Sequence, residues 1–165
     1  LYYLIGHELG HIKANHVLYF SVYGVLGSIL EMLGRRTLGF SDVASYALVL
    51  AYYEWSRQAE FSADRAGMLC AQNVDASLDG ILALTSGPNR LEHEADREAF
   101  LDQARAYQDM KLGDEMAKAA AFLVLGGGSR THPLPVHRAK EMDRWAASGG
   151  YEAVLRGSYP RQATG

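Results

Sequence analysis

The sequence has 165 residues, enough for one domain with a sizeable core. Apolar residues make up 48% and charged residues 21%, a globular balance that excludes a largely disordered chain. Lys and Arg number 16 against 19 Asp and Glu, so the net charge of −3 excludes the basic surface typical of nucleic-acid binding. The single cysteine excludes an intrachain disulfide framework and a thiolate metal cluster.

The first half of the chain is predicted to form two long helices. Residues 1–87 contain no proline, and two apolar-rich segments cover about Tyr3–Leu33 and Ser41–Asn73. The turn-like Gly34–Gly39 joins them, which predicts an antiparallel helical hairpin. Leu1–Ile5 is the one segment that could end a strand. Because the chain starts with Leu inside an apolar run, we expect it to be part of a longer protein.

The second half is also predicted to be helical. Apolar spacing and the breaks at glycine and proline indicate four further helices. Their expected ranges are Asp75–Thr85, Arg90–Met110, Asp114–Leu125 and Pro135–Ala147. The polar residues 157–165 are expected to form a loose tail. Together with the hairpin, these segments predict a mainly α fold.

Two uncharged stretches, Val17–Leu30 and Val43–Tyr53, raise the question of a membrane. As a helix, the first would span roughly 21 Å, less than the ~30 Å thickness of a hydrocarbon core. The length favours helices that are buried in a core or against another subunit. A hairpin that contacts a membrane remains the alternative. We therefore expect any membrane or oligomer contact to use residues within Val17–Tyr53.

The strongest chemical signal is the His-Glu-Leu-Gly-His motif at residues 7–11. In a helix, His7 and His11 lie about 40° apart on one face, so that both imidazoles can reach one metal ion. Glu8 lies beside that face, close enough to address a metal-bound water without being a ligand. A catalytic zinc ion normally takes three protein ligands and keeps one position for water. The motif therefore predicts a zinc site that needs one more ligand.

The third ligand is not a nearby histidine. Position 17 is Val17, which excludes the extended three-histidine motif of the metzincins. His16 lies five residues after His11, about 140° around a continuous helix, so we do not expect it to be a ligand. The remaining ligand must therefore come from a distant part of the chain.

The predicted hairpin supplies a carboxylate. A turn centred near Thr37 places His11 opposite the region of Ala63, and Glu60 lies about one helical turn away. Asp64 lies four residues further along the same face. Glu60 is therefore the expected third ligand. Asp64 is expected to hold a ligand histidine by its other ring nitrogen.

Three sequence blocks carry a family resemblance. They are His7–His11, the Glu-Phe-Ser-Ala-Asp of residues 60–64, and Thr131–Pro133 followed by Arg138. In this order they resemble the HtpX-like and CAAX-prenyl-protease-like zinc metalloendopeptidases, a branch of the gluzincins. The resemblance covers residue 3 to about residue 145.

The resemblance implies one zinc ion per chain, a general base, a histidine that stabilises the oxyanion, and two supporting side chains. His7, His11 and Glu60 would be the ligands, and Glu8 would be the general base. His132 would stabilise the oxyanion, Asp64 would be the outer partner of the ligands, and Arg138 would support the region of His132. The implied reaction is hydrolysis of peptide bonds in protein or peptide substrates, with no role for nucleic acid. The implied location is membrane-associated or cytoplasmic.

The resemblance also implies a zincin-like helical metalloprotease core. Residues 1–156 would be the C-terminal part of the catalytic domain, followed by the tail at 157–165. A small β-sheet, which members of the family place before the histidine motif, would lie upstream of this chain. An alternative stays open: a helical membrane-associated or partner-binding module whose zinc site is structural or inactive.

Overall fold

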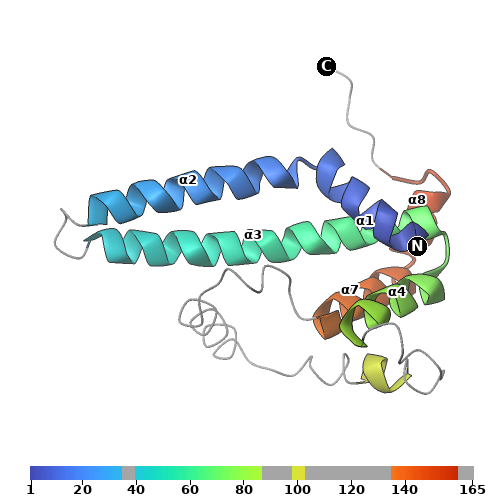
Figure 1. Ribbon diagram of the computed structural model, residues 1–165. Helices are drawn as coiled ribbons and strands as arrows, with labels where there is room; N and C mark the ends of the chain where they lie inside the picture. Colours follow the sequence, from blue (N-terminus) through green and yellow to red (C-terminus); the bar gives the residue numbers. More distant parts are fainter. Residues whose placement is uncertain (35–39, 87–97, 103–134, 160–165) are drawn as a thin grey trace. The chain divides into compact units, whose positions relative to one another are not determined.

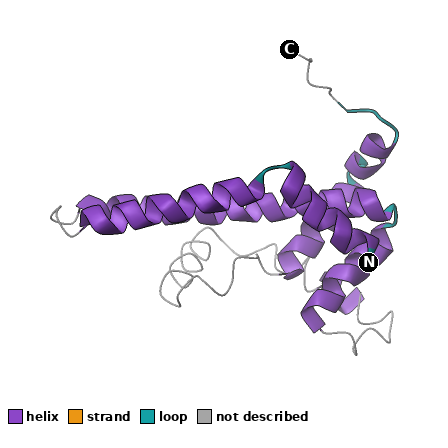
Figure 2. Cartoon of the chain, turned by 45° about the horizontal axis from the view of Figure 1, so that its top comes forward, coloured by secondary structure: helices purple, strands orange, loops and turns teal. Residues whose placement is uncertain are grey.

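The chain is helical wherever its structure is described. The computed structural model describes residues 1–34, 40–86, 98–102 and 135–159. Figure 2 shows helices joined by short loops in these ranges, with no strand among them. The prediction of a mainly α fold is confirmed. The suggestion that Leu1–Ile5 ends a strand was wrong, because the Ile5 amide donates to the Leu1 carbonyl at 3.1 Å and starts a helix there.

Six helices have defined bounds (Figure 1). They are α1 (Tyr2–Lys13), α2 (His16–Gly34), α3 (Phe40–Ala71), α4 (Val74–Ser86), α7 (Pro135–Ala147) and α8 (Gly150–Leu155). Three helices, α3, α4 and α7, match their predicted ranges closely. Helix α8 was not predicted. It follows Gly149, whose φ of 77° allows the tight turn after α7 that most other residues would resist.

Several predicted segments fall outside the described residues. They are the turn within 35–39, most of the helix expected at Arg90–Met110, the helix expected at Asp114–Leu125, and the end of the tail at 160–165. Within the first of these helices, residues 98–102 are described and are helical.

The first predicted helix is in fact two helices. Tyr3–Leu33 was expected to be continuous, but α1 ends at Lys13 and α2 begins at His16. Asn15 lies between them with a φ of 55°, in the left-handed region that Asn tolerates better than most residues. Its amide donates to the Ile12 carbonyl at 3.1 Å, which closes a turn in place of another helical step. The phase of the side chains therefore restarts at His16.

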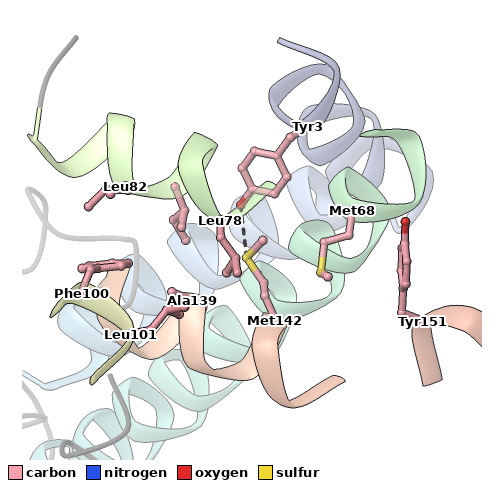
Figure 3. Close-up of a cluster of buried hydrophobic side chains, with 10 residues drawn as sticks. Tyr3, Met68, Leu78, Leu82, Phe100, Leu101, Ala139, Met142 and Tyr151 are labelled. Atoms are coloured by element: carbon pink, nitrogen blue, oxygen red, sulfur yellow. Dashed lines mark hydrogen bonds between the residues drawn. The ribbon is translucent and has the colours of Figure 1, made fainter. Parts of the chain in front are cut away.

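One compact unit comprises Leu1–Gly10, Phe61–Gln108 and Leu134–Gly165. Its core is a single cluster of buried side chains, to which helices α4, α7 and α8 contribute (Figure 3). Each large apolar side chain in such a core stabilises the fold by roughly 1.5–3 kcal/mol. The cluster consists of Tyr3, Met68, Leu78, Ile81, Leu82, Phe100, Leu101, Ala139, Met142 and Tyr151.

Small residues let α1 lie unusually close to α3 in this unit. A Cβ atom on Gly10 would lie only 2.8 Å from the Cβ atom of Ala66, and one on Gly6 would overlap Cys70. A Cβ atom on Gly67 would lie 2.7 Å from the ring of Tyr3. The close approach brings the buried face of α1 against α3, where polar side chains of the two helices can meet.

The second unit comprises His11–Glu60 and Asp109–Pro133. In its described part, α2 lies antiparallel and side by side with the first part of α3 (Figure 1). Aromatic rings fix the register: Phe20 meets Trp55 with ring centroids 5.2 Å apart, and Tyr23 stacks on Tyr52 at 3.6 Å. This pairing confirms the antiparallel arrangement predicted for the two helices, while the predicted turn near Thr37 lies outside the described residues. Among the described helices, none has the length and apolar character that crossing a membrane requires.

Candidate metal centre

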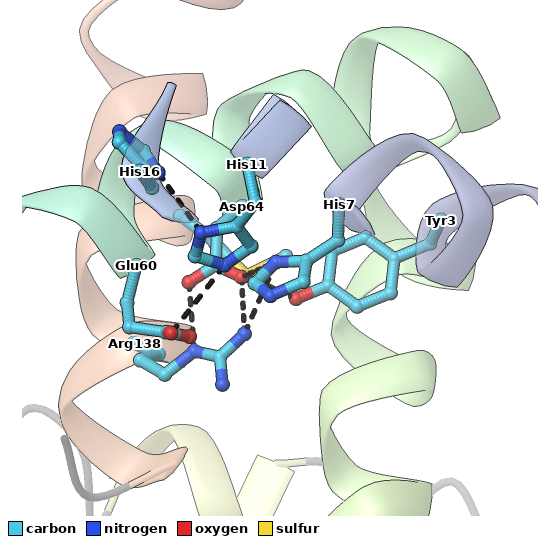
Figure 4. A network of polar contacts seen from close by, with 8 residues as sticks. Tyr3, His7, His11, His16, Glu60, Asp64 and Arg138 are labelled. Carbon is cyan, nitrogen blue, oxygen red and sulfur yellow. Dashed lines mark hydrogen bonds and ion pairs between the residues drawn. The ribbon is translucent and has the colours of Figure 1, made fainter. Parts of the chain in front are cut away.

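Two helices present the predicted ligands. Helix α1 carries His7 and His11 one turn apart, and α3 carries Glu60 and Asp64 one turn apart (Figure 4). His7 is 6% exposed, while Glu60 and Asp64 are each 1% exposed. The side chain of His11 is 12% exposed. Carboxylates are almost never buried this deeply without a compensating partner, so this burial itself marks a polar site.

His7, His11 and Glu60 form a group that could hold a metal ion. One ligand atom from each of the three lies within 4.8 Å of the other two. Nε2 of His11 and Oε1 of Glu60 are 3.4 Å apart. Two ligands of a tetrahedral ion with bonds of about 2.0–2.1 Å lie roughly 3.3–3.4 Å apart, so this separation already matches one edge of a zinc tetrahedron. Two imidazole nitrogens and a carboxylate oxygen are also a donor set that zinc accepts.

Asp64 is the centre of a buried polar network. Arg138 of α7 donates from Nε to Oδ2 of Asp64 at 2.9 Å and from Nη2 to Oδ1 at 2.5 Å. The hydroxyl of Tyr3 donates to Oδ1 at 2.7 Å, and Nδ1 of His7 lies 3.0 Å from the same oxygen. The two-pronged contact with a guanidinium is the strongest form of carboxylate recognition. The network therefore holds Asp64 in one orientation against His7.

The charge of Asp64 decides which nitrogen of His7 carries a proton. Burial by itself would raise the pKa of Asp64, but hydrogen bonds from Arg138 and His7, the guanidinium charge and the Tyr3 hydroxyl lower it to about 2. An ionised carboxylate only accepts hydrogen bonds, so Nδ1 of His7 must be the donor. In a neutral imidazole with this hydrogen bond the lone pair is on Nε2, and that form of imidazole can bind a metal ion.

Tyr3 is a site residue that sequence analysis missed. Burial, with the neighbouring carboxylate of Asp64, raises the pKa of Tyr3 above its usual value. The phenol therefore stays protonated and keeps donating to Asp64. Tyr3 could have been found from its position in the sequence, because it lies one turn before His7 on the same face of α1.

The predicted position of His16 relative to His11 was wrong. A continuous helix would have put it about 140° away from His11. Because the helix breaks at Asn15, Nδ1 of His16 instead lies 2.9 Å from Nδ1 of His11. The two rings meet edge to face with centroids 4.9 Å apart, and His16 is 7% exposed. His16 therefore contacts Nδ1 of His11, and the other ring nitrogen of His11, Nε2, faces Glu60.

Three further site residues were predicted, and the structure describes two of them, Glu8 and Arg138. Glu8 lies on α1 beside His7 and is exposed to solvent. Arg138 is buried and contacts Asp64, and Nη2 also lies 3.3 Å from Nδ1 of His7. His132, with its neighbours Thr131 and Pro133, lies outside the described residues. Its role, and the support that Arg138 was expected to give to that region, stay predictions.

Comparison with known proteins places the chain in a family. The chain is 31% identical over 156 residues to the plastoglobule-localized metallopeptidase 48, chloroplastic, of Arabidopsis thaliana. The match covers 93% of this chain but 42% of the relative, so the chain spans less than half of that protein's length. No solved structure matches the chain significantly. The family model of peptidase family M48 matches residues 1–146, which is most of the chain and includes both helices of the candidate metal centre. The chain belongs to peptidase family M48.

Proposed function

We propose that this chain is the catalytic part of a zinc-dependent metalloendopeptidase that hydrolyses peptide bonds in proteins. The observation that carries the proposal is the buried group of His7, His11 and Glu60, whose ligand atoms lie within 4.8 Å of one another. Membership of a peptidase family supports it, as does a relative whose name is that of a metallopeptidase. His7 and His11 would bind the ion through Nε2, and Glu60 through a carboxylate oxygen.

A zinc ion bound by these residues would supply a Lewis acid for the substrate carbonyl and lower the pKa of a water molecule toward 7. Glu8 then acts as the general base. Its carboxylate takes a proton from the attacking water and passes it to the amine nitrogen that leaves when the C–N bond breaks. The exposure of Glu8 supports this role, because a base that meets both water and substrate cannot be sealed in the core. His132 would donate a hydrogen bond to the developing oxyanion.

We propose the type of core and its residue boundaries together with this function. A zincin-like helical core would occupy residues 1–156, with 157–165 as a tail. The geometry of α1 against α3 supports the core assignment, because close packing at Gly6 and Gly10 lets the histidine helix reach the carboxylates of α3. Substrates are proposed to be proteins or peptides, in keeping with the family.

Residues Val17–Tyr53 are proposed to contact a membrane or another subunit. Helix α2 exposes large apolar side chains there: Val17 is 62% exposed, Leu18 60% and Val25 60%. Scattered apolar residues are ordinary on a surface, but several on one helix indicate a contact surface. This surface supports a membrane-associated location over a cytoplasmic one. The relative in Arabidopsis thaliana is plastoglobule-localized by name.

The test is the variant Glu8→Gln, with Glu152→Gln as the matched control on the exposed surface of α8. We expect Glu8→Gln to bind one zinc ion per chain, as the wild type does, and to lose cleavage of a labelled unstructured protein by at least about 100-fold. Glu152→Gln should keep both properties. Full turnover by zinc-loaded Glu8→Gln would refute the role of Glu8. Zinc binding without turnover in the wild type and in both variants alike would favour a structural site.

A further inference from the structure

We propose that His16 is a positioning residue that orients His11 for metal binding, an inference that rests on the proposed zinc site. Nδ1 of His16 lies 2.9 Å from Nδ1 of His11, within hydrogen-bond distance. Nε2 of His11, on the opposite side of the ring, lies 3.4 Å from Oε1 of Glu60. The ring of His11 is thus held between an imidazole on one side and the candidate ligand carboxylate on the other (Figure 4).

The hydrogen-bond chemistry gives each ring one tautomer. If Nε2 of His11 binds the metal ion, a neutral His11 must carry its proton on Nδ1. That proton is donated to Nδ1 of His16, which must therefore accept. His16 then carries its own proton on Nε2. A residue that accepts from a ligand histidine fixes both the tautomer and the tilt of the ligand ring.

The surroundings of His16 hold its ring in place. His16 is 7% exposed, and it meets the ring of Trp55 edge to face, with centroids 5.7 Å apart and planes at 87°. Trp55 is carried by α3, five residues before Glu60. His16 therefore rests on the same helix that supplies the candidate ligand carboxylate.

The break at Asn15 is what makes the contact. His16 is the first residue of α2, and the left-handed turn at Asn15 resets the helical phase just before it. The turn is closed by local hydrogen bonds, since the Leu18 amide donates to the Asn15 carbonyl at 3.1 Å. Residues in sparsely populated backbone regions cluster at functional sites, and the left-handed Asn15 directly precedes His16.

The experiment compares three variants of the zinc-free and zinc-loaded chain. His16→Phe keeps a ring against Trp55 but cannot accept a hydrogen bond. His16→Asn keeps a polar atom near the position of Nδ1. Phe20→Leu is the packing control, because it loosens another edge-to-face contact with Trp55 (centroids 5.2 Å apart) without touching His11. Zinc affinity is measured by chelator competition, and ligand geometry by the visible spectrum of the cobalt-substituted protein.

We expect zinc affinity to fall about 10–100-fold in His16→Phe, as is usual for loss of an outer partner, with an altered cobalt spectrum. His16→Asn should recover most of the affinity, and Phe20→Leu should match the wild type in both readouts. Wild-type affinity and spectrum in His16→Phe would overturn the inference, and so would equal losses in all three variants. A wild type that binds no zinc would instead overturn the proposed function and this inference with it.

A second measurement needs no variant. In the zinc-loaded wild type, nitrogen NMR of labelled histidine should show the proton of His11 on Nδ1 and the proton of His16 on Nε2. A proton on Nδ1 of His16 would contradict the inference, because that nitrogen could not then accept from His11.

Discussion

The two histidines of the motif, His7 and His11, lie one turn apart on the same helix. Their Nδ1 atoms nevertheless contact chemically different partners, a carboxylate in one case and an imidazole in the other. Nδ1 of His7 faces the carboxylate of Asp64, which is held by Arg138 and Tyr3. Nδ1 of His11 faces the imidazole of His16, which carries no negative charge. Two candidate ligands of the same type can therefore be supported by chemically different partners, and the sequence motif alone does not reveal those partners.

The difference has an electrostatic consequence for the proposed site. The negative charge of Asp64 is matched by the guanidinium of Arg138 at hydrogen-bond distance. His16, which is neutral in the proposed hydrogen bond with His11, would add no charge. Among the proposed ligands, Glu60 is the one that brings a negative charge. A dipositive ion would keep a net positive charge in these surroundings, which preserves the Lewis acidity that hydrolysis requires.

Removal of Arg138 is expected to cause the largest loss of stability. Arg138→Met leaves the buried carboxylate of Asp64 without its cation, which typically costs about 3–5 kcal/mol. The free energy of unfolding of the zinc-free protein, measured in urea, should fall by that amount. The double variant Asp64→Asn with Arg138→Met should recover part of the loss, because the uncompensated charge is gone.

The matched control is Arg144→Met on the same helix. The side chain of Arg144 is 72% exposed, and its nitrogen lies 3.6 Å from the carboxylate of Glu141. Exposed pairs of this kind contribute about 0–1 kcal/mol, so the control should unfold almost like the wild type. Equal losses in Arg138→Met and Arg144→Met would show that the contact with Asp64 is no stronger than a surface ion pair.

A smaller loss of stability is expected at low pH, where Asp64, the hydrogen-bond partner of His7, becomes protonated. The pKa of Asp64 is lowered from 3.8 to about 2 in the folded chain. A lowered pKa means that the stabilisation is fully present above pH 3.8 and is lost as the pH falls toward 2, by roughly 2 kcal/mol in total. In zinc-free protein, the difference in unfolding free energy between wild type and Asp64→Asn should therefore shrink between pH 4 and pH 2. A difference that is constant over this range would contradict the assigned network.

Much of the candidate metal centre was predictable because it follows from helix geometry. The spacing of His7 and His11 places both on one face of a helix. The hairpin register then brings Glu60 within reach, and the stacking of Tyr23 on Tyr52 confirms that register. Both steps use regular periods, which sequence alone supplies.

The unpredicted parts depend on a single residue or on distant contacts. The break at Asn15 is carried by one left-handed residue inside a continuous apolar pattern, so the change of phase at His16 could not be read from periodicity. Arg138 meets Asp64 across 74 positions of sequence, a contact that no local spacing predicts. Tyr3 could have been found as a neighbour of His7 on the helix, but its bond to Asp64 could not.

The most direct test of the proposed centre is the zinc affinity of Glu60→Gln, measured by chelator competition beside the control Glu54→Gln. Glu54 lies on the same helix, is 54% exposed and pairs with Arg57 at 2.8 Å. We predict one zinc ion per chain in the wild type and the control, and a loss of affinity in Glu60→Gln beyond the 10–100-fold typical of an outer partner. Wild-type zinc affinity in Glu60→Gln would contradict the account.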